Sequence, residues 1–355
     1  MKTLLPVNTK LCSSLSIFLF LLLLIFTSGC KKILEHLPDP TITTVATGLT
    51  NVIGVETDTK GNAWVALFGT GVNDGKIVVV TPDGNKYDAI INLSSIINPL
   101  SGEIDGTAHM LIDGDTMFIT SAKFLYKADI SQFTPGDAPL DGASMAYEDI
   151  GAFSLSYPYK NNAHDSHIYG ITKGPEGDIY LTDAGANSVI HRLASGNYAV
   201  LAEVPGYDNP TSIGPPQVQS VPTGILFDGS NFLVTTLTGF PFLPGYASVY
   251  KISLSGALSV YEDSFTTLVN IARGNMLGHL VVQYGTFGEF GFEHNTGALI
   301  WANGRTSEPF IEGLDMPVGI KQLSPDTWYV TTQGDGSLLK ITYREGSSPH
   351  STPTN

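Results

Sequence analysis

The stretch Val221-Pro-Thr-Gly-Ile-Leu-Phe-Asp-Gly-Ser-Asn-Phe-Leu-Val-Thr235 carries the pattern that decides the fold. An apolar run begins with proline and glycine, an Asp-Gly turn follows it, and a second β-rich run ends with threonine. Similar stretches lie at 51–66, 167–183 and 316–331, and two weaker copies begin at Thr107 and Thr267. Aligned on the glycine or its substitute, the copies fall at Gly54, Met110, Gly170, Gly224, Asn270 and Gly319. This recurrence predicts a repeat architecture.

Each copy is long enough for four short strands joined by turns such as Asp83-Gly84 and Asp335-Gly336. A single four-stranded unit cannot cover both of its faces, so neighbours must stack, and a closed ring removes the exposed strand edges. Six copies therefore predict an all-β, six-bladed β-propeller. The last copy has residues for three strands only, so we expect the β-rich segment 41–47 to complete that blade as an N-terminal closing strand.

Side chains in the repeats have expected structural roles. The recurring glycine lies where inner strands crowd toward a central channel, and the missing side chain permits close backbone approach. We expect Trp64, Tyr180 and Trp328 to pack between neighbouring blades.

Composition excludes several classes of protein. The 355 residues include 33 acidic and 18 basic side chains, and a formal net charge of −15 argues against a nucleic-acid binder. With 42% hydrophobic and 14% charged residues, the chain is not a disordered acidic tail. Two cysteines cannot form a disulfide framework or a four-thiolate zinc site. The 38 glycines and 21 prolines disfavour long helices.

The N-terminus indicates export. Lys2 and Lys10 precede an apolar run at 17–26, and small residues then lead to Cys30. This order is typical of a secretory signal, and the run is too short to span a membrane comfortably. It resembles a bacterial lipoprotein signal, which implies cleavage before Cys30 and acylation of that residue. The alternative is an ordinary cleaved signal with an incidental cysteine. Cys12 lies in the part removed.

These features predict four segments: a signal peptide at 1–29, a tether at 30–40, the propeller at 41–343 and a disordered tail at 344–355. The expected location is the cell envelope, with a lipid anchor at Cys30 in the outer membrane of a Gram-negative bacterium.

A family resemblance adds to this reading. It rests on Val221-Pro-Thr-Gly-Ile, Thr238-Gly-Phe-Pro-Phe-Leu-Pro-Gly245, Val249-Tyr-Lys-Ile252, Asp183-Ala-Gly-Ala-Asn187 and Gly313-Leu-Asp-Met-Pro-Val-Gly319. Together these resemble the ScyD/ScyE family of exported propellers over about residues 47–342. Two positions depart from that family: Thr236, where a glutamate is frequent, and Ser166-His167-Ile168, where Ser-Asn-Pro is more common. The resemblance implies a propeller similar in shape to NHL and gluconolactonase-type proteins, with no established catalytic residues to transfer.

The functional site of such a ring is expected on one face. Loops that enter the inner strands converge there with loops that join second and third strands. Two long segments, 136–166 and 205–220, are predicted to overhang this face. The candidate ligand-binding residues at the channel mouth are His109, His167, Tyr169, Thr223, Asn270, Phe240 and Phe242.

A metal site is the second candidate. His164 and Asp165 lie beside His167, and imidazoles with a carboxylate can bind a divalent cation such as Ca²⁺ or Zn²⁺. These side chains can equally hydrogen-bond the backbone of their own loop. The positions that hold calcium in gluconolactonase-type propellers correspond to Ile53, Thr223 and Val269, and none of them is a carboxylate.

The sequence therefore predicts a lipid-anchored envelope propeller, a monomer that binds a small molecule or an envelope protein on its loops. No cofactor is firmly implied, and whether the chain is an enzyme stays open. The alternative is a metal-assisted hydrolase or lactonase that uses His164, Asp165, His167 and Asn270. A purely structural surface protein would have no pocket at the channel mouth.

Overall fold

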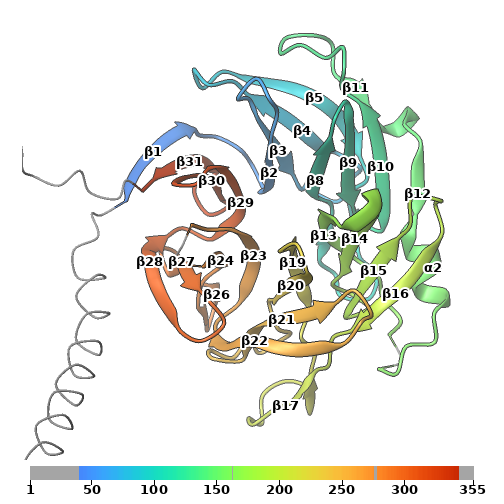
Figure 1. Ribbon diagram of the computed structural model, residues 1–355, viewed down its shortest axis with the longest axis vertical. Helices are drawn as coiled ribbons and strands as arrows, with labels where there is room; N and C mark the ends of the chain where they lie inside the picture. Colours follow the sequence, from blue (N-terminus) through green and yellow to red (C-terminus); the bar gives the residue numbers. More distant parts are fainter. Residues whose placement is uncertain (1–39, 162, 276–277, 344–355) are drawn as a thin grey trace, which may run out of the picture. The chain divides into compact units, whose positions relative to one another are not determined.

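In the computed structural model, residues 40–161, 163–275 and 278–343 are described, and the predicted signal, most of the tether and the tail lie outside them. Residues Thr41–Thr342 form one compact unit. Within it, six antiparallel sheets surround a central channel (Figure 1). The predicted six-bladed propeller is confirmed. The described residues include no helix long and apolar enough to cross a membrane.

The strands of each blade follow one another from the channel outward. The first blade contains β2 (Val52–Thr57), β3 (Ala63–Leu67), β4 (Gly75–Val80) and β5 (Lys86–Leu93). The second contains β8 (Thr107–Asp113), β9 (Thr116–Ser121), β10 (Phe124–Asp129) and β12 (Tyr147–Asp149). The third contains β13 (Ile168–Lys173), β14 (Ile179–Asp183), β15 (Ser188–Arg192) and β16 (Tyr198–Glu203). The next two are β19 (Pro222–Phe227), β20 (Asn231–Thr236), β21 (Ala247–Ser253) and β22 (Leu258–Phe265); and β23 (Leu268–Arg273), β24 (His279–Gln283), β27 (Gly297–Ala302) and β28 (Ser307–Leu314).

The sixth blade closes the ring. It contains β29 (Pro317–Ser324), β30 (Thr327–Thr332) and β31 (Ser337–Thr342), and its outer strand is β1 (Thr41–Ala46). β1 runs antiparallel to β31, with Thr41 opposite Thr342. The first strand of the described chain thus completes the last blade, as predicted.

Shorter elements decorate the blades. Small hairpins are formed by β6 (Ile96–Ile97) with β7 (Ile104–Asp105), β17 (Tyr207–Asp208) with β18 (Gln217–Val218), and β25 (Phe287–Gly288) with β26 (Gly291–Phe292). The remaining elements are β11 (Leu140–Asp141), which pairs in parallel with β5, the 3₁₀ turns η1 (Gly142–Ser144) and η2 (Pro175–Gly177), and the helix α2 (Ile150–Ser156).

The prediction that 136–166 is a plain overhanging loop is wrong. This segment supplies β12, the outer strand of the second blade, and then α2. The side chain of Asp149 caps α2 by accepting a hydrogen bond from the Ala152 amide, and Ile150 is fully buried. An aspartate cap before an apolar residue is the sequence signal for this helix.

The recurring glycines lie where neighbouring inner strands approach closely. A Cβ on Gly170 would come within 2.3 Å of the Thr223 carbonyl oxygen, and one on Gly319 within 2.4 Å of that of Ile53. Such contacts exclude any side chain, so the predicted steric role is confirmed.

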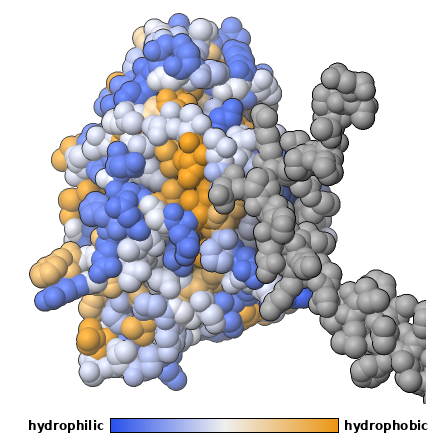
Figure 2. Space-filling model, turned by 90° about the vertical axis from the view of Figure 1, so that its left-hand side faces the viewer, coloured by the Kyte–Doolittle hydropathy of each residue, from blue (hydrophilic) through white to orange (hydrophobic). Residues whose placement is uncertain are grey.

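Apolar side chains fill the spaces between blades. Tyr180 packs on Phe232 of the next blade, and the fully buried Trp328 packs on Trp301 of the preceding one. Trp64 joins a cluster with Met110 of the second blade. On the side of the molecule seen in Figure 2, polar residues cover much of the visible surface and leave a narrow apolar band. The core thus lies between the blades, and the channel and loops remain for function.

Candidate functional site

The strand order defines two faces of the ring. We call the face where inner strands begin the loop face, because loops between second and third strands lie there as well. Around the channel, the layer nearest this face is apolar: Ile53, Ala108 and Val318 are buried, and Phe68, Tyr169 and Tyr284 pack on them. We call this layer the plug.

A cavity of about 530 Å³ lies on the loop face, among the segments that enter the second, third and fourth blades, and we call it the loop-face cavity. It lies between the β6–β7 hairpin, the segment that precedes β13, the β14–β15 turn and the segment before β19. Its lining residues are Asn98, Leu100, Ser101, Glu103, Ile104, Asp105, Asn161, Ala163, His164, Asp165, His167, Ala184, Gly185, Gln219 and Val221.

A hydrogen-bonded group of polar side chains forms one wall of this cavity. Nδ1 of His167 lies 3.1 Å from Oδ1 of Asp105. Nδ2 of Asn98 donates to Oδ2 of Asp105 at 2.9 Å, and it lies 3.1 Å from both oxygens of Asp165. Burial raises the pKa of Asp105, and the charges of Asp165 and Asp183 act in the same direction, against the opposing effects of His167 and Asn98. The wall therefore concentrates negative charge.

The fully buried Asp183 at the end of β14 holds this wall in place. Its Oδ2 accepts hydrogen bonds from the hydroxyls of Ser154 at 2.6 Å and Ser166 at 2.7 Å. Its Oδ1 accepts from the amides of His167 at 2.9 Å and Ala186 at 3.1 Å. One carboxylate thus joins α2, the strand β13 and the β14–β15 turn, so Asp183 positions the site.

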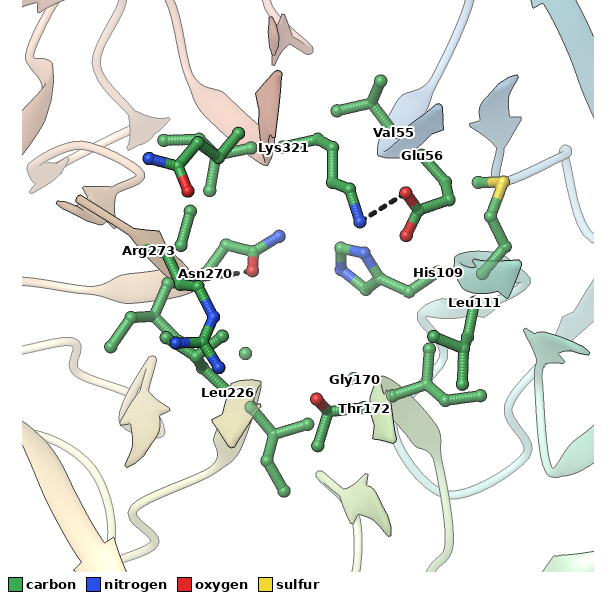
Figure 3. A pocket seen from close by; sticks show the side chains of 18 residues that line it. Val55, Glu56, His109, Leu111, Gly170, Thr172, Leu226, Asn270, Arg273 and Lys321 are labelled. Carbon is green, nitrogen blue, oxygen red and sulfur yellow. Dashed lines mark hydrogen bonds and ion pairs between the residues drawn. The ribbon is translucent and has the colours of Figure 1, made fainter. Parts of the chain in front are cut away.

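Beyond the plug, in the half of the channel farther from the loop face, lies a second cavity of about 220 Å³, which we call the channel cavity (Figure 3). All six inner strands line it, and on β2, β8, β13 and β29 the lining residues follow a plug residue. Its polar side chains include Glu56, His109, Thr172, Asn270, Arg273, Lys321 and Gln322. Glu56 and Lys321 form an ion pair at one wall.

His109 extends into the channel and faces the side from which Asn270 projects (Figure 3). It is 8% exposed, and its Nε2 has no hydrogen-bond partner among the described residues. Burial lowers the pKa of His109 to about 4. The ring of Tyr169 lies 4.8 Å from the His109 ring and 6.0 Å from the His167 ring, so Tyr169 separates the two histidines.

An aromatic cluster occupies the loop face at the fourth and fifth blades. Phe240 precedes Pro241 across a cis peptide bond and is 47% exposed. The Phe242 ring lies 4.8 Å from that of Phe287 and 5.2 Å from that of Phe292. The β20–β21 loop and the β25–β26 hairpin therefore pack together through these rings.

The structure distributes the predicted site residues over five places. His164, Asp165 and His167 line the loop-face cavity, whereas His109 and Asn270 line the channel cavity. Tyr169 belongs to the plug, and Phe240 and Phe242 lie in the aromatic cluster. Thr223 is buried in the blade wall, where its hydroxyl donates to the Leu268 carbonyl at 2.9 Å.

Sequence reasoning missed Asn98 and Asp105. Both belong to the connection before β8, whose hairpin brings them beside the segment before β13. A usable signal was available for Asp105, because it stands two residues before an inner strand, where the loops converge.

The metal hypothesis has no ready ligand set in the described part of the chain. No group of three or more His, Cys, Asp or Glu side chains there is arranged to hold a metal ion. Asn270 lies in a different cavity from His164, Asp165 and His167, so these four residues do not come together.

No protein-family description matches the sequence. No curated protein matches it either. Solved structures of similar shape include a PQQ-bound aldose sugar dehydrogenase from Streptomyces coelicolor, with a TM-score of 0.56 and 14% identity, which covers 87% of this chain and 100% of that one. A candidate gluconolactonase has a TM-score of 0.51 and 12% identity over 88% and 96% of the two chains. A catalytically inactive virginiamycin B lyase from Staphylococcus aureus, with quinupristin, has a TM-score of 0.50 and 16% identity over 86% and 100%. These neighbours are NHL/gluconolactonase-type propellers, and at these identities they establish the fold alone.

Proposed function

We propose that this chain binds a small amine-bearing molecule in the loop-face cavity. One observation carries the proposal. Three carboxylates, those of Glu103, Asp105 and Asp165, line the cavity, and no lysine or arginine is among the described residues that line it. A site of this charge favours a cationic ligand.

The burial of Asp105 strengthens the argument. Its carboxyl group loses hydration in the wall and faces Asp165 and Asp183, which raises its pKa. Only His167 and Asn98 oppose this effect. An ammonium group that donates to Asp105 and Asp165 would offset the repulsion between them, and the gain would be realised only on binding.

The arrangement supports binding rather than proton transfer. In an Asp–His pair, the second ring nitrogen is the one that would take a proton from a substrate. The Phe68 and Tyr169 rings lie beside the His167 imidazole at centroid distances of 5.9 and 6.0 Å, and its Nδ1 lies 3.1 Å from Asp105. His167 therefore serves to hold Asp105 in position.

We also propose a family and a cellular location for this chain. We assign the chain to the ScyD/ScyE-like propellers. We expect a lipid anchor at Cys30 to hold it at the outer membrane, and we expect the protein to be a monomer. The family motif 238–245 supports this assignment, since it forms the β20–β21 loop on the loop face. The alternative is a metal-assisted hydrolase or lactonase with Ca²⁺ or Zn²⁺; of its four expected ligands, His164, Asp165 and His167 line this cavity and Asn270 lines the channel cavity.

Thermal unfolding of the full chain, purified in detergent, tests the proposal. The probes are glucosamine and putrescine, with glucose and 1,4-butanediol as neutral counterparts. We expect the amines alone to raise Tm, because a ligand at a hundredfold excess over its Kd stabilises the native state by about 2.7 kcal/mol. Glu103→Gln and Asp165→Asn should each reduce the effect, whereas Asp263→Asn, an exposed change in β22, should not.

Equal stabilisation by amines and neutral probes, or none by either amine, would contradict this function. A rise in Tm with Ca²⁺ or Zn²⁺ that a chelator reverses, without a response to amines, would favour the metal-assisted alternative.

A further inference from the structure

The channel cavity carries charges opposite to those of the loop-face cavity. Arg273 and Lys321 line it against the single carboxylate of Glu56, so its formal charge is positive in a chain of net charge −15. Glu56 is 7% exposed. Its carboxylate forms an ion pair with Lys321 and accepts a hydrogen bond from the Thr57 amide at 2.9 Å. The acid is therefore already bound, and no ion pair joins Arg273 to a carboxylate in the described part of the chain.

Arg273 retains donors for a ligand. One terminal nitrogen donates to the Phe227 carbonyl at 2.7 Å, which fixes the guanidinium at the edge of the cavity. The residue is exposed, and Figure 3 shows its side chain at the margin of the cavity, next to Leu226. A guanidinium has five N–H donors in a planar fork that matches a carboxylate.

His109 provides the second recognition element. It is more than nine-tenths buried, it extends toward the channel axis, and its Nε2 has no partner within the described chain. A buried polar atom without a hydrogen bond is costly, and a ligand that supplies the bond removes that cost. Since burial keeps the imidazole neutral near pH 7, Nε2 can donate one N–H to an acceptor.

Access to this cavity is independent of the loop-face cavity. The plug residues Ile53, Ala108 and Val318 precede the channel-cavity residues along their strands and fill the loop-face half of the channel. A ligand must therefore enter from the face where the inner strands end, the side on which Arg273 lies.

We propose that the channel cavity is a second binding site, specific for a small monocarboxylate. The carboxylate lies against the free edge of the Arg273 guanidinium and near Lys321. A hydroxyl or carbonyl oxygen on the rest of the molecule accepts the hydrogen bond from Nε2 of His109. The volume of about 220 Å³ suits a molecule of a few heavy atoms.

The test is a titration of the isotopically labelled full chain in detergent, followed by NMR of the histidine ring nitrogens. The probes are L-lactate and acetate, with lactamide and acetamide as neutral counterparts, and His109→Gln assigns the His109 signals. We expect saturable shifts of His109 with the acids alone, and L-lactate should bind more tightly than acetate because only it carries a hydroxyl for Nε2.

Substitutions make the test specific. Arg273→Gln should weaken L-lactate binding by at least about 10-fold through the lost charge-assisted hydrogen bonds. Arg273→Lys should retain part of the affinity. Lys251→Gln removes an exposed charge from β21 and should change nothing. Equal binding of acids and amides, an Arg273→Gln variant with unchanged affinity, or no shift of His109 at 10 mM probe would overturn the proposal.

Discussion

At the scale of single residues, burial changes the chemistry of this chain most clearly at His109. The side chain lies in the channel at 8% exposure, and the loss of hydration disfavours its charged form. Its pKa falls from 6.5 to about 4. In the unfolded chain the same histidine is hydrated and titrates near its ordinary value.

This difference predicts that His109 makes stability depend on pH. Between pH 6.5 and 4 the unfolded chain binds a proton at His109 and the native state does not, so stability falls as the pH decreases through this window. The loss attributable to His109 is about 3 kcal/mol at pH 4. Urea unfolding of the wild type and of His109→Gln at pH 7 and pH 4.5 measures it, and the variant should lose less stability on acidification.

Lys251→Gln, an exposed change in β21, provides the control. It removes no group that titrates between about pH 4 and 7, so it should leave the pH dependence of the wild type intact. If His109→Gln and the wild type lose equal stability between the two pH values, the imidazole of His109 is not neutral in the native state as described.

At the scale of elements, threonines on the second strands bind neighbouring blades together. Each of three hydroxyls donates to a carbonyl on the inner strand of the next blade: Thr120 to Tyr169 at 2.7 Å, Thr182 to Thr223 at 2.6 Å and Thr331 to Ile53 at 2.5 Å. In three of the six blades, a threonine near the end of the second strand is thus an inter-blade contact, a role that the repeat pattern did not reveal.

Thr331 makes this contact where the ring closes, between the sixth blade and the first. Its oxygen also accepts from the Gly319 amide at 2.8 Å. Thr331→Val preserves the shape and leaves buried polar groups without these bonds, so we expect a loss of about 1–3 kcal/mol in the free energy of unfolding. Denaturant unfolding measures it. Thr43→Val, at an exposed position of β1, should be nearly neutral, and an equally neutral Thr331→Val would show that the closing contact adds no stability.

At the scale of the whole molecule, one pairing makes the ring continuous. β1 supplies the outer strand of the blade that begins at Pro317, so the two ends of the compact unit Thr41–Thr342 are paired with each other. Segments outside that unit can then be altered without loss of a blade.

This independence predicts the effect of removing the anchor. Cys30→Ser should abolish fatty-acid labelling of the chain, because the thiol that would carry the lipid is absent, while the propeller keeps the Tm of the wild type. Cys12→Ser is the matched control, since it lies in the predicted signal and should leave the labelling intact. Metabolic labelling with a fatty acid followed by immunoprecipitation gives the result, and unchanged labelling of Cys30→Ser would contradict lipidation at this residue.

The architecture could be predicted from local patterns: six repeats, glycines at the inner strands and an unpaired first strand are features that a closed ring alone satisfies. The arrangement of the site could not be predicted in this way. His109 stands one residue before the aligned position of its repeat and His167 three residues before its own, and the plug places them in separate cavities. Asn98 donates a hydrogen bond to Asp165, which lies 67 residues further along the chain. Repeats specify backbone and core because every blade obeys the same packing rule, whereas cavities depend on loops that differ from blade to blade and meet only after the ring has closed.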